Sequence, residues 1–128
     1  MGSATTAKER SIDKSAIRDA ATIIVLRDPG TNPTVLMGQR GASAAFMPGK
    51  FVFPGGAVDA NDAEVPVTPL TPLDETRLAS ESALSPAALA AAAIRELWEE
   101  TGQILGHPGA WDDAPQGWRG FSKTGHVP

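Results

Sequence analysis

The sequence of 128 residues contains no cysteine, which excludes several kinds of chemistry. Disulfide bonds, thiolate metal sites and a cysteine nucleophile are all ruled out. Serine does not fill the gap, because no base is paired in sequence with a candidate serine nucleophile. A reducing compartment agrees with this composition, and we expect a cytoplasmic protein.

Long apolar runs and basic clusters are also missing. No apolar run approaches the roughly 20 residues that a membrane-spanning helix needs, and residues 1–15 lack the apolar segment of a secretory signal. Eleven Lys and Arg, scattered singly, face 15 Asp and Glu, for a net charge of −4. We therefore expect neither a membrane nor a nucleic-acid polymer as a partner. A small polyanionic substrate is still compatible, because bound divalent cations reverse the local sign of the field.

The length suits one domain, and 41% hydrophobic residues suffice for a globular core. We expect a flexible tail over residues 1–18 and one domain over 19–128. Apolar, β-rich runs separated by turn signals predict an α/β protein with short strands. The first two strands should form a hairpin. The predicted strands are 20–26, 34–38, 51–53, 57–59 and 103–105.

Residues 60–84 have no sustained period and contain Pro66, Pro69 and Pro72. This pattern predicts a surface insertion, with a short helix around residues 74–80.

A helix is predicted from Pro86 to Thr101. Ser85 suits its N-cap, proline suits the first helical position, and Gly102 suits the residue after its end. The alanine-rich first half is a strong helix former. Its buried side is predicted to contain Leu89, Ala90, Ala93, Ile94 and Leu97.

The end of this helix carries an unusual density of carboxylates. Glu96, Glu99 and Glu100 stand at i, i+3 and i+4 and share a face. Arg95 lies four residues before Glu99 and could fix its orientation. A solvated acidic face is one reading of this stretch. A site for Mg²⁺ or Mn²⁺ is the other, since carboxylate oxygens suit these ions and negative charge is disfavoured at a helix C-terminus.

The stretch 95–102, Arg-Glu-Leu-Trp-Glu-Glu-Thr-Gly, follows Phe53-Pro54-Gly55-Gly56 along the chain. Together they resemble the signature of the Nudix hydrolases, in which a Gly, five residues, a Glu and seven residues precede Arg-Glu-apolar-x-Glu-Glu-x-Gly-apolar. Here Asp62 stands in place of the first Glu, and 32 residues separate it from Arg95. Gln103 stands where an apolar residue is usual.

The resemblance implies an α/β/α sandwich around a mixed β-sheet. It covers roughly residues 20–105, so we expect the strands and the helix that follow the motif in the family to be missing from this sequence. An incomplete sheet exposes an edge, which makes a homodimer one expectation. The split motif, and more loosely residues 35–56, resemble the coenzyme A diphosphatase-like branch.

The resemblance further implies metal-assisted attack of water on phosphorus, cleaving the diphosphate linkage of a nucleotide-like small molecule. It makes Glu99 and Glu100 metal ligands, Glu96 a further ligand or a general base, and Arg95 the group that orients Glu99. The carbonyl of Gly56 is implied as an extra ligand.

Three further expectations concern the substrate-binding residues, the residue that replaces the first Glu of the motif, and the alternative function. Arg40, Gly55 and Gly56 are candidate substrate-binding residues. Asp62 is the first candidate for the role of the missing Glu, with Glu64 and Glu75 as rivals that are more simply read as solvated. A non-catalytic ligand-binding domain on the same scaffold is the alternative function.

Overall fold

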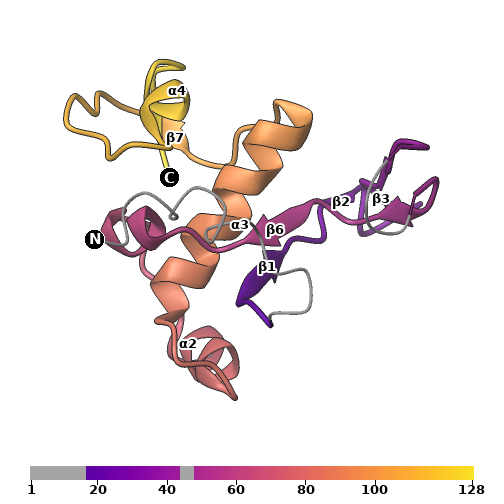
Figure 1. The fold of residues 1–128 in the computed structure, drawn as a ribbon, viewed down its shortest axis with the longest axis horizontal. Helices are drawn as coiled ribbons and strands as arrows, with labels where there is room; N and C mark the ends of the chain where they lie inside the picture. The colour runs from indigo at the N-terminus through magenta and orange to yellow at the C-terminus, as the bar shows by residue number, and fades with distance from the viewer. Residues whose placement is uncertain (1–16, 44–47) are drawn as a thin grey trace, which may run out of the picture.

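The computed structural model describes residues 17–43 and 48–128. Its longest element, α3 (Pro86–Thr101), runs through the middle of the molecule (Figure 1). The antiparallel pair of β1 (Ala20–Thr22) and β6 (Gly55–Ala57) lies against this helix. Because α3 contains residues 95–101 and β6 contains Gly55 and Gly56, this contact brings the two parts of the Nudix-like motif together.

Both ends of α3 are where the sequence predicts them. The Ser85 side chain accepts a hydrogen bond from the amide of Ala88 at 3.1 Å, and Pro86 is the first helical residue. Gly102 ends the helix in the left-handed region, with a φ of 75°. An N-cap of this kind is worth about 1 kcal/mol, and glycine avoids the steric penalty of a side chain at positive φ.

The strands are shorter than predicted and pair two by two. In the described residues every pairing is antiparallel, so the expected mixed sheet is not assembled there, although the α/β class is confirmed. The first predicted strand divides into β1 and β2, and the second into β3 and β4. The hairpin between them is confirmed as the β2–β3 pair. The remaining strands are β2 (Leu26–Arg27), β3 (Thr34–Val35), β4 (Gly38–Gln39), β5 (Phe51–Val52), β7 (His107–Pro108) and β8 (His126–Val127).

Two strand predictions were misplaced. The strand expected at 57–59 is β6, which begins at Gly55 and includes both glycines. A Cβ atom on Gly55 would meet the carbonyl oxygen of Ala21, so only glycine allows this close pairing. The strand expected at 103–105 is wrong, because these residues pair with no described strand.

The insertion contains two short helices. The 3₁₀ helix η2 (Ala60–Glu64) packs on α3, and α2 (Pro72–Ala79) confirms the helix that the sequence predicts there. No residue of α2 is buried. The limits of the domain and of the insertion stay predictions, and the expected tail lies almost wholly in residues 1–16, outside the described residues.

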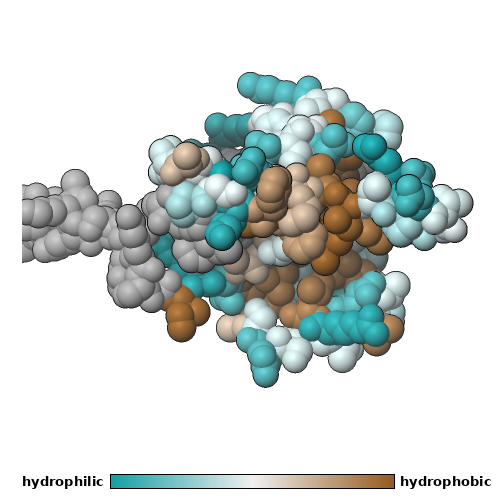
Figure 2. Space-filling view, turned by 90° about the vertical axis from the view of Figure 1, so that its right-hand side faces the viewer, coloured by the Kyte–Doolittle hydropathy of each residue, from teal (hydrophilic) through white to brown (hydrophobic). Residues whose placement is uncertain are grey.

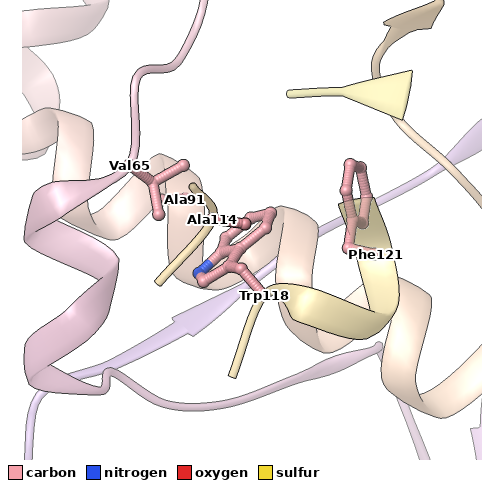
Figure 3. Packing of buried hydrophobic residues seen from close by; sticks show 5 residues of the cluster. All are labelled: Val65, Ala91, Ala114, Trp118 and Phe121. Atoms are coloured by element: carbon pink, nitrogen blue, oxygen red, sulfur yellow. The ribbon is translucent and has the colours of Figure 1, made fainter. Parts of the chain in front are cut away.

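The largest buried cluster joins the insertion, α3 and the C-terminal segment. Trp118 and Phe121 are fully buried, with ring centroids 5.1 Å apart in an edge-to-face arrangement (Figure 3). Each buried aromatic ring removes about 150–250 Å² from water, worth roughly 4–6 kcal/mol before entropy is counted. The cluster consists of Val65, Ala91, Ala114, Trp118 and Phe121.

The buried side of α3 differs from the prediction. Of the expected residues only Leu97 is fully buried, and the other four are half-buried. The difference arises because the strands and η2 pack on one side of α3 and the C-terminal segment packs on another (Figure 1). The fully buried residues are Ala88, Ala91, Ala92, Arg95 and Leu97.

Apolar side chains also gather on the surface, on the side from which β2 and β3 project (Figure 2). Phe51 is 65% exposed, and Ile24, Leu26 and Val35 are exposed as well. Among the described residues each strand there pairs with one other strand, so an edge with no strand partner in that part of the chain lies beside apolar side chains. Within the described ranges, no helix has the length and apolar character needed to cross a bilayer.

Candidate functional site

A buried guanidinium group organises the site. The side chain of Arg95 is 4% exposed and forms ion pairs with Asp59, Asp62, Glu96 and Glu99. Its Nε and Nη2 atoms donate to the two carboxylate oxygens of Asp62 at 2.9 and 3.0 Å. Nη1 donates to Glu96 Oε1 and Glu99 Oε2, both at 3.1 Å, and Nη2 also donates to the carbonyl of Ala57 at 3.0 Å. One side chain thus connects η2, β6 and two glutamates of its own helix.

Asp62 holds the buried end of Arg95. Its side chain is fully buried and also accepts hydrogen bonds from the amide of Asp59 and the indole N–H of Trp118, each at 2.9 Å. Burial alone would raise the pKa of Asp62. The hydrogen bonds from Arg95, Asp59 and Trp118 outweigh it and bring the pKa below its ordinary value. This aspartate therefore stays ionised in the interior.

The insertion folds back so that Asp62 contacts Arg95 on α3. Both carboxylate oxygens are occupied by protein donors, so in this arrangement Asp62 orients the arginine. Its role as a metal ligand stays a prediction. The rivals Glu64 and Glu75 are exposed.

The glutamates become more exposed along the helix. Glu96 is 15% exposed and Glu99 is 41% exposed. Burial raises the pKa of Glu96, and the neighbouring Glu100 raises it further against the opposing effect of Arg95. Burial and the charge of Glu96 likewise raise the pKa of Glu99. These carboxylates are crowded enough that losing a proton is harder than usual.

Gly56 provides the space for this crowding. A Cβ atom built on Gly56 would lie 2.6 Å from the carboxyl carbon of Glu96. The carboxylate thus rests on the bare backbone of β6, close to the peptide groups of the Pro-Gly-Gly segment. Carboxylate and carbonyl oxygens are the donor types that suit Mg²⁺ or Mn²⁺.

The expected ligands do not converge on one point in the part of the chain that the structure describes. No three Asp, Glu or His side chains there gather closely enough to hold a metal ion. The physical reason is visible in the contacts: Glu96 and Glu99 both turn toward Nη1 of Arg95, which neutralises part of their charge. A cation would compete with the guanidinium for these oxygens.

A hollow of about 530 Å³ opens beside the glycines. Arg40 lines it from the segment after β4, where its backbone pairs with Lys50. Gly55, Gly56 and Glu100 line it as well. The three candidate substrate-binding residues therefore line the same space as Glu100, and Glu100 and Gly56 are also candidate metal ligands.

Two features of the site escape sequence reasoning. The spacing of Arg95 and Glu99 predicts their contact, but no local signal places the arginine in the interior. Trp118 carries only a packing signal, and its hydrogen bond to Asp62 joins residues 56 positions apart. Contacts of this range depend on how the C-terminal segment folds back.

Comparisons with known proteins agree on one family. No protein-family model matches the chain. "Putative nudix hydrolase 7" of Caenorhabditis elegans is 39% identical over 97 residues, which are 76% of this chain and 25% of that protein. The crystal structure of a NUDIX hydrolase from Alicyclobacillus acidocaldarius aligns with a TM-score of 0.53 and 36% identity. This alignment covers 73% of this chain and 40% of that one.

The chain thus spans about a quarter of the curated relative and two fifths of the solved one. Both similarities cover most of this chain, and they agree with the Arg-Glu-Leu-Trp-Glu-Glu-Thr-Gly helix and its neighbouring Pro-Gly-Gly. The α/β, Nudix-like class of the fold is confirmed by the solved structure. In its motif, its fold and these comparisons, the chain is similar to the Nudix hydrolases over about three quarters of its length.

Proposed function

We propose that this chain acts as a Nudix-type hydrolase that cleaves the diphosphate linkage of a nucleoside diphosphate derivative with the help of Mg²⁺ or Mn²⁺. The observation that carries the proposal is that Glu96 lies against Gly56, which lines a hollow together with Glu100 and Arg40. A diphosphate brings negative charge and needs cations. Arg40 brings a guanidinium to the lining of the hollow, and the glutamates suit a divalent ion that would add more positive charge.

The chain's own residues supply the donor types for such an ion, and the carboxylates would turn from Arg95 to reach it. Glu96, Glu99, Glu100 and the carbonyl of Gly56 would hold it, in agreement with the raised pKa values of the first two glutamates. When bound, a divalent ion neutralises phosphate oxygens and lowers the pKa of coordinated water. Glu96 is either a further ligand or the base that accepts the proton of the attacking water.

Arg95 and Arg40 have separate tasks in this proposal. Arg95 is buried and holds Glu96 and Glu99 in fixed orientations, so it acts on the carboxylates and not on the substrate. Arg40 lines the hollow, where a guanidinium can bind phosphate oxygens in pairs. A coenzyme A-like substrate is the finer form of the proposal, and it rests on the sequence resemblance alone. A homodimer through the exposed strands and a cytoplasmic location stay predictions.

The test is a phosphate-release assay with Mg²⁺ over a panel of nucleoside diphosphate derivatives, including coenzyme A. The double substitution Glu99→Gln, Glu100→Gln should lower kcat/KM by at least about 100-fold, because it removes two charged ligands and keeps the shape. Glu64→Gln, Glu75→Gln is the matched control: two exposed carboxylates of the insertion change and activity should not. Equal rates for parent and double variant would refute the proposal.

A binding domain without turnover is the second candidate. The observation in its favour is that Arg95 already occupies Glu96 and Glu99 in this structure, which opposes the binding of a metal ion. Calorimetry with the same nucleotides decides between the two. Nucleotide binding without phosphate release would support the binding domain, and turnover with Mg²⁺ would support the hydrolase.

A further inference from the structure

One hydrogen bond connects the C-terminal segment, residues 107–128, to the charged centre of the site. Trp118 lies in this segment just before α4 (Arg119–Ser122) and is fully buried. Its indole N–H donates to Oδ1 of Asp62 at 2.9 Å. Figure 3 shows its ring between Val65, which follows η2, and Phe121. A residue far from the motif in sequence thus contacts the carboxylate that binds Arg95.

The carboxylate of Asp62 has no accepting capacity left. It receives four N–H groups: the amide of Asp59, the indole of Trp118, and Nε and Nη2 of Arg95. A carboxylate offers about four acceptor positions, so the donors together fix its rotation. Without the indole donor, one buried oxygen would lose a partner and the carboxylate could turn.

The orientation of Asp62 sets the plane of the guanidinium. Two parallel hydrogen bonds from Arg95 to Asp62 define that plane, and its outer nitrogen, Nη1, then reaches Glu96 and Glu99. A rotation of the carboxylate would therefore move Nη1 relative to both glutamates. The contacts form one continuous path from the indole to the two candidate metal ligands.

We propose that Trp118 is a positioning residue of the site: its indole N–H fixes Asp62, and through Asp62 it fixes Arg95, Glu96 and Glu99. It touches no substrate. The catalytic part of this inference rests on the proposed hydrolase function, whereas the effect on Arg95 does not.

The competing explanation is packing alone, since Trp118 also contacts Phe121 and Trp111, with a centroid distance of 5.7 Å to Trp111. Trp118→Phe keeps an aromatic ring and removes the donor. Trp111→Phe is the matched control, because the same change is made in the same cluster at an indole whose N–H has no hydrogen bond in the described part of the chain. Replacing Trp118 by benzothienylalanine, which has sulfur in place of N–H, removes the donor at nearly constant shape.

The first measurement follows Arg95 directly, without turnover. In ¹H–¹⁵N spectra the Nε–H of Arg95 should be protected from exchange with water in the parent, because it is buried and bonded to Asp62. Trp118→Phe and the benzothienylalanine variant should shift this signal and speed its exchange by at least about tenfold, the lower end of the effect of one hydrogen bond to a charged group. Trp111→Phe should leave the signal in place. An unchanged Nε–H signal in both Trp118 variants would overturn the inference.

The second measurement covers the metal and the reaction. Mn²⁺ binding followed by electron paramagnetic resonance should weaken about tenfold in the Trp118 variants and not in Trp111→Phe. In the hydrolase assay, kcat should fall about tenfold with KM changed by less than about threefold, because only the glutamates are displaced. If the Trp118 variants lose stability but keep the kcat and the Mn²⁺ affinity of the parent, Trp118 contributes packing alone and the inference is wrong. A parent that binds Mn²⁺ but hydrolyses nothing would refute the proposed function and leave the positioning role supported by the first two readouts.

Discussion

Single residues around Arg95 show how much the surroundings decide the state of a carboxylate. Asp62 and Glu96 bind the same guanidinium, yet their pKa values shift in opposite directions. Burial opposes ionisation in both. At Asp62 the hydrogen bonds from four N–H donors outweigh the effect of burial. Glu96 instead shares one donor with Glu99 and has Glu100 beside it. Removing one partner of a buried ion pair typically costs about 3–5 kcal/mol, so the Arg95–Asp62 pair cannot be broken without large loss of stability.

The raised pKa of Glu96 makes a prediction about stability and pH. A group whose pKa is higher in the folded state adds stability that is fully present below its unfolded pKa, about 4.3, and lost as pH rises through the folded value. Glu96→Gln keeps an acceptor for Arg95 but no charge. In urea unfolding with EDTA, we expect this variant to be more stable than the parent at pH 7, with the difference disappearing near pH 4.

Glu64→Gln is the control for that experiment, because Glu64 is exposed and its substitution should leave the urea midpoint unchanged at either pH. A Glu96→Gln variant that is less stable than the parent at pH 7 would contradict the expected sign.

At the level of elements, β6 brings its two neighbouring glycines close to different groups. Gly55 faces β1, where a Cβ atom would lie 2.9 Å from the Cα of Thr22. Gly56 faces the carboxyl group of Glu96, the movable end of a long side chain. The same added methyl group should therefore damage the fold at one position and the site at the other. The pairing of β6 with β1 makes this distinction, since the motif alone shows only two adjacent glycines.

Alanine substitutions separate these two effects. Gly55→Ala should lower the free energy of unfolding by about 1–3 kcal/mol, as overpacking against backbone does. Gly56→Ala should stay within about 1 kcal/mol of the parent but weaken Mn²⁺ binding by about tenfold, because the carboxylate of Glu96 must move. Chemical denaturation and Mn²⁺ titration of both variants provide the measurements. A loss of stability at Gly56 as large as at Gly55, with Mn²⁺ affinity intact, would show that Glu96 does not depend on this space.

For the whole molecule, the acidic balance and the crowded glutamates make stability depend on cations. The net charge is −4, and one guanidinium, that of Arg95, is shared among Asp59, Asp62, Glu96 and Glu99. A divalent ion that binds only the folded state adds stability in proportion to the logarithm of its concentration. The chain spans only part of the length of its relatives. This linkage should be visible even where turnover is absent, because it depends on binding to the folded state alone.

Mg²⁺ at 100 times its dissociation constant should raise the free energy of unfolding by about 2.7 kcal/mol. Glu99→Gln, Glu100→Gln should abolish that gain, while NaCl at equal ionic strength should not reproduce it in the parent. Thermal unfolding of both proteins across a Mg²⁺ series measures the effect. Identical Mg²⁺ stabilisation of parent and variant would place the cation somewhere other than the glutamates.

The sequence by itself determined the features whose causes are local. Ser85, Pro86 and Gly102 mark the ends of α3 through interactions within a few residues, and the order of residues in the motif indicated the family. Strand limits were less predictable, because a strand ends where its partner ends. Gly55 and Gly56 read as a loop and became a strand only by pairing with β1.

Only the tertiary structure decided what the charged residues contact. Arg95 lies inside because Asp62, 33 positions away, meets it there, and Asp62 is fixed by an indole 56 positions away. Helical and strand periodicity relates residues only a few positions apart, so it predicts neither of these separations along the sequence. A buried ion pair is stable only when every donor and acceptor is satisfied, and in this protein the donors come from the insertion, the motif helix and the C-terminal segment together.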